Sequence, residues 1–241
     1  MKNVIENQET SNESRCFALA SNDLLDGALP AITPFYQEDG ITLYNADCAQ
    51  VLPFLPTFDL LLTDPPYGIG RDGQKLSISK RKHGGRKHYN FEGWDAQPPE
   101  TWLLQMCISK AKDQVIWGAN YFPHIFPPKM GWLVWDKGQN ICSSDCELAY
   151  SSRDNALRRM VLNRVALLKD VTSHPTQKPI ALMKWCLGFF PEAKTVLDPF
   201  AGSGTTLRAA KDLGLSAVGI EINESYCQTA VERLRQQTLG F

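Results

Sequence analysis

Short apolar runs alternate with amphipathic stretches along most of this chain. Short apolar runs bounded by turn residues predict buried strands, and longer stretches with a helical apolar period predict helices. Strands that alternate with helices build a parallel sheet covered on both faces. We therefore expect an α/β domain with a doubly wound, mostly parallel sheet, in which strands 131–135 and 147–151 form an antiparallel pair. The other expected strands are 41–44, 58–63, 115–117, 195–197 and 216–220, and the expected helices are 101–112, 177–190, 207–213 and 224–236.

This pattern is interrupted in two places. Residues 1–33 are rich in Asn, Glu and Ser and show little periodicity, which is typical of a mobile tail. Residues 68–93 are rich in glycine and contain a strongly basic run, with seven basic side chains against one acidic side chain between positions 71 and 90. We expect a tail over 1–33 and a single domain over 34–241 that carries a basic loop at 68–93.

Composition narrows the setting of the protein. The 241 residues are 43% hydrophobic with a net charge of −1, which suits one domain with a sizeable core. No apolar stretch is long enough to cross a membrane, and the N-terminus lacks a basic start and an apolar core, so we expect a cytoplasmic protein. We expect the seven cysteines to be reduced. A zinc site from Cys142, Cys146, His83 and His88 is an alternative, but the spacing is loose and we expect no metal.

The most specific local signal is Asp64-Pro65-Pro66-Tyr67, which directly follows the expected strand 58–63. Ligands of open α/β sheets bind outside the carboxyl ends of the strands. The prolines make a stiff turn whose carbonyl oxygens are free acceptors, next to one carboxylate and one ring. These three features suit a nucleobase with an exocyclic amino group. The alternative is an ordinary strand-to-loop corner with an exposed tyrosine.

A second signal is glycine-rich and follows the expected strand 195–197. Its sequence, Asp-Pro-Phe-Ala-Gly-Ser-Gly-Thr over 198–205, leads into a helix, so that a ligand can approach the backbone closely. Glu221 ends the next expected strand, 19 residues after Gly202, which is the spacing of a ribose-binding acid. A dinucleotide oxidoreductase is an alternative, but Leu207 stands where its third glycine would be.

Together these segments resemble the S-adenosylmethionine-dependent DNA methyltransferases that modify amino groups. The family's motifs are (D/N/S)-P-P-(Y/F/W), D-P-F-x-G-S-G-T and H-P-T-(Q/E)-K-P, matched here at 64–67, 198–205 and 174–179. The tetrad precedes the glycine loop, which resembles the circularly permuted β class. The resemblance implies a Rossmann-like methyltransferase fold, S-adenosylmethionine as the cofactor and DNA as the partner.

The resemblance also assigns the chemistry of the tetrad. Asp64 and the Pro65 carbonyl would accept the two hydrogens of the target amino group, Pro66 would stiffen the turn, and Tyr67 would stack on the flipped base. The Asp form of the tetrad favours adenine N6 as the target. Cytosine N4 is an alternative, for which the Ser form is more typical, and an RNA methyltransferase is a more distant one.

The cofactor contacts that the resemblance implies lie on three segments. Asp198 would bind the methionine ammonium, Glu221 the ribose and Asp47 the adenine, although Asp47 could instead be only a helix N-cap. Lys178 would lie near the cofactor carboxylate, or could be an exposed lysine in the first turn of a helix. The full set is Asp47, Thr176, Lys178, Asp198, Phe200, Ala201, Gly202, Ser203, Gly204, Thr205 and Glu221.

The basic run directly follows the tetrad, so we expect it to contact DNA phosphates. A solvated run is the alternative. The expected DNA-binding residues are Arg71, Lys75, Lys80, Arg81, Lys82, Arg86 and Lys87. A second basic cluster, formed by Arg153, Arg158, Arg159, Arg164 and Lys169, could read bases or coat a helix. Only about 130 residues separate the two main motifs, which leaves little room for a target-recognition region, so we expect a short target sequence or relaxed specificity. The oligomeric state is not predicted, and a homodimer is one alternative.

Overall fold

The computed structural model describes residues 32–70, 95–138, 144–163 and 177–236. The chain divides into two units, Met1–Thr33 and Pro34–Phe241. The first unit lies almost wholly outside the described residues, so the mobile tail over 1–33 stays a prediction. Among the helices that are described, none is both long and apolar enough to span a membrane.

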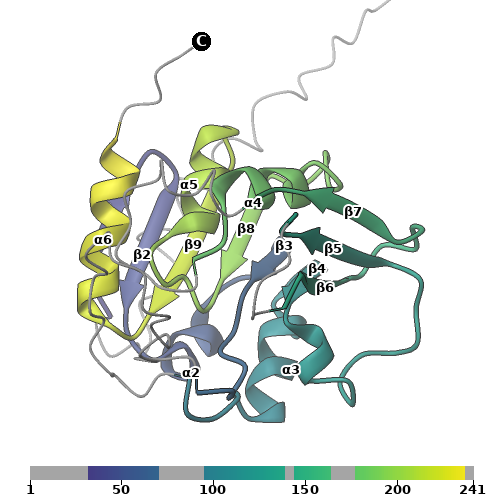
Figure 1. Cartoon of the computed structure of the whole chain (residues 1–241). Helices are drawn as coiled ribbons and strands as arrows, with labels where there is room; N and C mark the ends of the chain where they lie inside the picture. The colour runs from purple at the N-terminus through teal and green to yellow at the C-terminus, as the bar shows by residue number, and fades with distance from the viewer. Residues whose placement is uncertain (1–31, 71–94, 139–143, 164–176, 237–241) are drawn as a thin grey trace, which may run out of the picture. The chain divides into compact units, whose positions relative to one another are not determined.

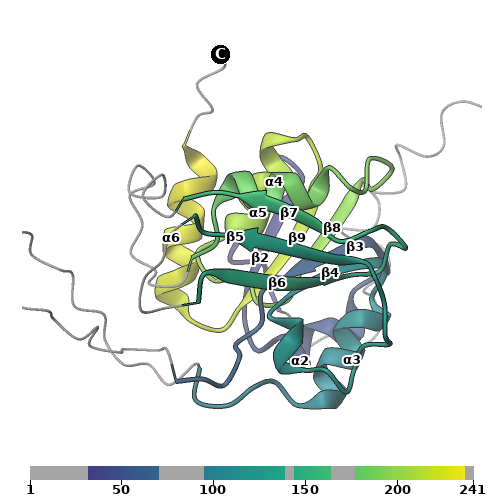
Figure 2. The same ribbon diagram turned by 45° about the vertical axis from the view of Figure 1, so that its right-hand side comes forward.

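A mixed sheet forms the centre of the second unit (Figures 1 and 2). Its described part has nine strands in the order β1-β2-β9-β8-β3-β4-β6-β5-β7. Strands β2, β9, β8, β3 and β4 are mutually parallel, β6 is antiparallel to β4 and β5, and β1 is antiparallel to β2. The bounds are β1 Tyr36–Glu38, β2 Ile41–Asn45, β3 Phe58–Thr63, β4 Ala111–Trp117, β5 Trp132–Asp136, β6 Cys146–Ser151, β7 Arg158–Val161, β8 Thr195–Asp198 and β9 Ser216–Glu221.

Helices cover both faces of this sheet. Successive side chains of a strand point to opposite faces, so Leu60 and Leu62 of β3 join one core while Leu61, also fully buried, faces the other way. The core of Leu60 includes side chains of α4 and α6, and these helices lie together with α5 in Figure 1, apart from α2 and α3. The helical bounds are α2 Cys48–Val51, η1 Leu52–Phe54, α3 Thr101–Ser109, η2 Ala119–Tyr121, α4 Ile180–Leu187, α5 Thr205–Asp212 and α6 Glu224–Arg235.

The expected α/β architecture is confirmed, including the antiparallel pair β5 and β6. Several details differ from the sequence-based expectation, and the helix expected over 177–190 extends only over Ile180–Leu187. The helix expected over 101–112 ends at Ser109, and residues from Ala111 onward already pair with β3. The strands β1 and β7 were not expected. Arg158 and Arg159 lie on β7, so the alternative that these two residues coat a helix is wrong. Arg164 and Lys169 lie outside the described residues.

The parallel strands decide where a site can form. Neighbouring strands β2, β9, β8, β3 and β4 all end at the same edge of the sheet. Segments far apart in the sequence therefore meet there, as open α/β sheets require for a ligand site.

Candidate active site

A row of acidic residues lies along this carboxyl edge. Glu221 ends β9 and Asp198 ends the neighbouring β8, while Asp47 and Asp64 follow β2 and β3. The Thr63 hydroxyl, at the end of β3, donates to Asp198 Oδ1 over 2.7 Å. This hydrogen bond joins the strand that carries the tetrad to the strand that carries the glycine loop. The fold thus brings the two motifs together.

The glycine loop is bound to Glu221. The Gly202 N–H donates to Glu221 Oε2 over 2.7 Å, and the Asn223 N–H donates to Oε1 over 2.8 Å. Gly202 has a φ of +51°, and a Cβ added there would meet no atom within 4 Å. Gly204 has a φ of +76°, and a Cβ there would lie 2.7 Å from the Ala230 Cβ on α6. Gly204 therefore permits close packing of α6, whereas the space beside Gly202 is open.

An arginine that the motifs do not include supports the same loop. Arg233 lies on α6 and is 5% exposed. Its Nη1 donates to the Ser203 carbonyl over 2.9 Å, and lies 3.1 Å from the Ser203 hydroxyl and 3.2 Å from the Thr205 hydroxyl. A basic residue in the last turn of a helix looks ordinary in sequence, so no sequence signal pointed to this role.

The acids beside the glycine loop are held by neutral donors. The Asp198 carboxylate, 3% exposed, accepts from the Thr63 hydroxyl and, over 3.2 Å, from the Phe200 N–H. Burial raises the pKa of Asp198 to about 6 and that of Glu221 to about 7. Within the described part of the chain, neither acid forms an ion pair. These acids therefore fit a ligand that brings its own positive charge, as the ammonium and sulfonium of S-adenosylmethionine would.

The tetrad is ordered by hydrogen bonds on both sides of the turn. Tyr67 donates its hydroxyl proton to Asp64 Oδ1 over 2.5 Å, and Lys178 Nζ donates to Asp64 Oδ2 over 2.5 Å. Behind the turn, Asp95 Oδ1 accepts from the N–H groups of Tyr67 and Gly68 at 2.9 and 2.8 Å. Asp95 is 28 positions beyond Tyr67, and no motif identified it. The result is a tetrad whose carboxylate has a fixed orientation.

Two residues expected to contact the cofactor have other contacts here. Lys178 pairs with Asp64 and lies 3.0 Å from Glu147 Oε2. Asp47 is exposed and caps α2, accepting from the Ala49 N–H over 2.9 Å. Capping α2 is the alternative role for Asp47 that the sequence left open. The contacts of Asp47 and Lys178 with the cofactor stay predictions. Thr176 lies outside the described residues.

The Tyr67 ring is packed against one turn that follows β4. The Tyr121 ring stacks on it, with centroids 4.8 Å apart and an interplanar angle of 15°. A Cβ on Gly118 would lie only 1.9 Å from the Tyr67 ring, and Gly118 has a φ of +68°. Gly118 is therefore required for the position of Tyr67. Stacking of Tyr67 on a flipped base stays a prediction.

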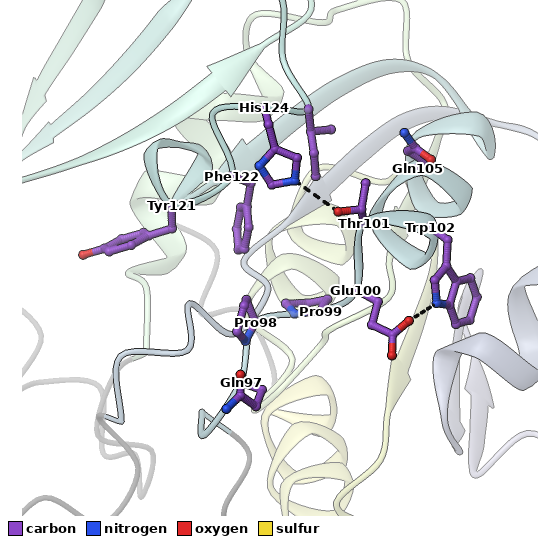
Figure 3. A pocket seen from close by; sticks show the side chains of 11 residues that line it. Gln97, Pro98, Pro99, Glu100, Thr101, Trp102, Gln105, Tyr121, Phe122 and His124 are labelled. Carbon is purple, nitrogen blue, oxygen red and sulfur yellow. Dashed lines mark hydrogen bonds between the residues drawn. The ribbon is translucent and has the colours of Figure 1, made fainter.

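A hollow of about 810 Å³ opens beside Tyr121 (Figure 3). In Figure 3 the Phe122 side chain points down toward Pro98, and the Tyr121 ring lies to one side. The Thr101 hydroxyl and His124 Nε2 lie 3.1 Å apart, and the Trp102 indole donates to Glu100. The lining of the hollow mixes rings and prolines with the polar side chains of Gln97, Glu100, Thr101 and Gln105.

Several expected positions fall outside the described residues. They include the whole DNA-binding set, Arg71, Lys75, Lys80, Arg81, Lys82, Arg86 and Lys87, and the zinc alternative at His83, His88 and Cys142. Cys146 is exposed. No group of three or more His, Cys, Asp or Glu side chains that could hold a metal occurs in the described ranges.

Comparison with known proteins agrees with this geometry. A model of the DNA methylase family (N6_N4_Mtase) matches residues 151–232. The type II methyltransferase M.HpaI of Haemophilus parainfluenzae is 46% identical over 235 residues, which covers 77% of this chain and 70% of that protein. The type II methyltransferase M.ScaI of Streptomyces caespitosus is 26% identical over 273 residues, covering 85% of this chain and 84% of that protein.

Solved structures show the same fold. The M1.HpyAVI–SAM complex has a TM-score of 0.54 and 23% identity, covering 80% of this chain and 100% of that chain. The cytosine-N4-specific PvuII DNA methyltransferase has a TM-score of 0.59 and 14% identity, covering 87% of this chain and 92% of that chain. The Rossmann-like methyltransferase fold is therefore confirmed, while the permuted motif order stays a prediction.

The identity to M.HpaI extends over most of both chains and so covers more than one motif. It agrees with the tetrad and the glycine loop, which the structure places at adjoining strand ends. We conclude that the chain belongs to the N6/N4 amino-methyltransferase family of DNA methyltransferases, which use S-adenosylmethionine as the methyl donor.

Proposed function

We propose that this DNA methyltransferase is a site-specific enzyme that transfers the methyl group to N6 of adenine. The observation that carries the proposal is Asp64, an aspartate at the first tetrad position, held by Tyr67 and Lys178 beside the strand of the cofactor loop.

The chemistry of an exocyclic amino group explains why these acceptors are needed. Its lone pair is delocalised into the ring, so the nitrogen is a poor nucleophile until it becomes more pyramidal. Asp64 accepts one amino hydrogen and the Pro65 carbonyl accepts the other. Both acceptors stabilise the positive charge that grows on nitrogen in the transition state. Pro66 keeps the turn rigid, so the nitrogen is positioned without further reorganisation.

The target base has to leave the duplex to reach this edge of the sheet. In this proposal Tyr67 provides the stacking surface, and Tyr121 supports its ring from one face. Cytosine N4 is the second candidate target, because the same two acceptors can hold either amino group. The Asp form of the tetrad supports adenine.

S-adenosylmethionine supplies a methyl group already activated on a sulfonium when it is bound. In our proposal Asp198 binds its ammonium, Glu221 its ribose hydroxyls and Asp47 its adenine, while the backbone of residues 200–205 approaches the ligand closely. Thr176 would contact the cofactor carboxylate, and Lys178, whose ammonium contacts Asp64 and Glu147, would favour that carboxylate through its positive charge. Asp198 is buried without an ion-pair partner among the described residues, which supports a cationic group of the ligand beside it.

For DNA, we propose that the basic residues between 71 and 87 contact phosphates. Such contacts give affinity without sequence preference, and each contributes about 0.9 to the log–log slope of affinity against salt. Both M.HpaI and M.ScaI are named type II methyltransferases. We propose the same restriction–modification setting, in the cytoplasm, for this protein.

One experiment tests the target base. The protein is incubated with S-adenosylmethionine labelled in the methyl group and with DNA of mixed sequence, and the DNA is digested to nucleosides. We expect label in N6-methyldeoxyadenosine. Label in N4-methyldeoxycytidine would replace the adenine assignment with the second candidate. Label on RNA and none on DNA would overturn the proposal.

A further inference from the structure

Behind Asp64 a line of alternating charges continues into the protein. Lys178 Nζ lies 2.5 Å from Asp64 Oδ2 and 3.0 Å from Glu147 Oε2, and Lys137 Nζ lies 2.7 Å from Glu147 Oε1. The two lysine side chains are only 4% and 2% exposed. Two carboxylates and two ammonium groups thus form a neutral series, and no motif assigns a role to Glu147 or Lys137.

The hairpin of β5 and β6 holds the far end of this series. Glu147 of β6 pairs in register with Trp135 of β5, and Lys137 follows β5 directly. The Lys137 backbone N–H donates to the Asp145 carbonyl over 2.9 Å, and its ammonium lies 5.4 Å from the Trp135 ring. Glu147 is therefore fixed by the sheet and not by a loop (Figure 2 shows β5 and β6 side by side).

The Lys178 ammonium also donates to the Tyr67 hydroxyl over 3.1 Å, but Tyr67 belongs to the tetrad that the lysine has to hold in place. Lys178 precedes α4, and its long side chain reaches the tetrad by passing over the rings of Trp117 and Tyr67, at 5.8 and 5.5 Å. A buried lysine with one carboxylate partner can follow that partner when the partner moves. A second carboxylate on a rigid strand fixes the ammonium in place.

We propose that Glu147, supported by Lys137, is a positioning residue that holds the Lys178 ammonium against Asp64, so that the catalytic carboxylate stays aimed at the target amino group. This inference rests on the proposed function of Asp64. It holds for an adenine or a cytosine target, because either presents the same amino group.

The electrostatics agree with this geometry. Although burial alone would raise it, the pKa of Glu147 is lowered to about 2 by Lys178 and Lys137, so Glu147 stays charged. Burial raises the pKa of Asp64, Lys178 opposes this effect, and Glu147 adds to it. The other groups that face Asp64 are the Tyr67 hydroxyl and, farther away, the Asp198 carboxylate.

The test is Glu147→Gln, measured in single turnover with DNA and saturating S-adenosylmethionine. We expect the transfer rate to fall roughly 10- to 100-fold, because a small misplacement of a catalytic group has effects of that size. The affinities for cofactor and DNA should stay close to wild type. The acidic limb of the pH–rate profile should move to lower pH, because the carboxylate that raised the pKa of Asp64 is gone and Asp64 is then the one carboxylate paired with Lys178.

Asp212→Asn is the matched control. Asp212 is also a buried carboxylate between two cations, with Lys184 and Arg208 each at 2.7 Å, but it ends α5 away from the tetrad. This variant should lose thermal stability and keep the wild-type transfer rate and pH profile. Glu147→Asp keeps the charge, and it should recover part of the rate and the wild-type acidic limb.

The outcomes separate this inference from the proposed function. An active wild type with an unchanged rate and pH profile in Glu147→Gln would overturn the role of Glu147 alone. A loss of rate matched by an equal loss of folded protein, with no recovery in Glu147→Asp, would reduce Glu147 to a structural residue and also overturn it. A wild type that methylates no DNA would instead contradict the proposed function.

Discussion

The acids on the cofactor side of the active-site edge and those on the target side have opposite kinds of partner. On the cofactor side, Asp198 and Glu221 are bound by hydroxyl and backbone N–H donors, and their pKa values are raised to about 6 and about 7. On the target side, Asp64 and Glu147 are bound by the ammonium groups of Lys178 and Lys137. Each side has two carboxylates, of which only Asp198 is fully buried, but only the target side has its charge balanced within the described residues.

The difference matches the charge of what each half would receive. S-adenosylmethionine arrives with positive charge, so acids without a cationic partner favour its binding. A target amino group arrives neutral and becomes positive only during transfer. A bare carboxylate there would attract cations before reaction, whereas one already paired stabilises the developing charge without binding a cation tightly beforehand.

The largest expected effect comes from the target side. Asp64→Ala removes the acceptor for one amino hydrogen, and we expect turnover to fall by at least roughly 10²–10³-fold, the usual cost of losing one such group. Affinity for S-adenosylmethionine should stay near wild type, because Asp64 faces the target. Titration calorimetry beside a methylation assay measures both. Near wild-type turnover would remove Asp64 from the catalytic role and end the contrast between the two halves.

On the cofactor side, Glu221→Ala should have the opposite profile. The carboxylate proposed to bind the ribose also holds the Gly202 N–H. Its loss should cost roughly 1.5–3 kcal/mol of cofactor binding, the range for a hydrogen bond to a charged group, which is about a 10- to 150-fold weaker Kd. Single-turnover transfer at saturating cofactor should change far less. Unchanged cofactor affinity in a variant with a normal circular dichroism spectrum would contradict the placement of the site.

The comparison also predicts an effect of pH. The ionised forms favour both proposed contacts, Asp198 with the ammonium and Glu221 with the ribose hydroxyls, so cofactor affinity should fall by about tenfold from pH 7.5 to pH 6 as the two acids take up protons near pH 6 and pH 7. The free protein should respond in the opposite direction. The folded pKa of each acid lies above its unfolded value, so the free energy of unfolding from this pair rises as pH falls from about 7 toward 5.

Glu221→Gln is the control for this pH effect, because it has no carboxyl group at that position. It should remove the part of both trends near pH 7 and keep the part near pH 6 that comes from Asp198, as read by calorimetry for binding and by thermal melts for stability. Affinity that does not depend on pH in the wild type would show that these acids do not bind the cofactor.

The sequence predicted the cofactor half better than the target half, for a physical reason. Asp198, Gly202 and Glu221 lie within one strand–helix–strand unit, whose spacing along the chain is fixed by local geometry. The partners of Asp64 come from distant segments. Glu147 lies on an antiparallel strand and Asp95 beyond the basic run, and no spacing rule connects either of them to the tetrad.

The success of the secondary-structure prediction also depended on whether a strand is buried or lies at an edge of the sheet. Parallel strands with continuous apolar runs, such as β3 and β8, were predicted because both of their faces are buried. The edge strands β1 and β7 were missed because most of their residues are exposed and polar. Their pairing with β2 and β5, and not their composition, makes them strands.

The smallest expected effect is a test of the open space at Gly202. Gly202 and Gly214 lie at opposite ends of α5, have φ values of +51° and +70°, and would each carry a Cβ with no atom within 4 Å. Gly202→Ala and Gly214→Ala should therefore lose similar stability, about 1 kcal/mol each, because an L-residue is strained at positive φ. Only Gly202→Ala should weaken S-adenosylmethionine binding, by less than Glu221→Ala does, because only its Cβ enters space that we propose the ligand fills. Thermal melts and binding titrations of the two variants measure this difference. Equal cofactor affinities in the two variants would show that the ligand does not approach the Gly202 backbone. Of the proposed cofactor contacts on this side, those of Asp198 and Glu221 would then remain.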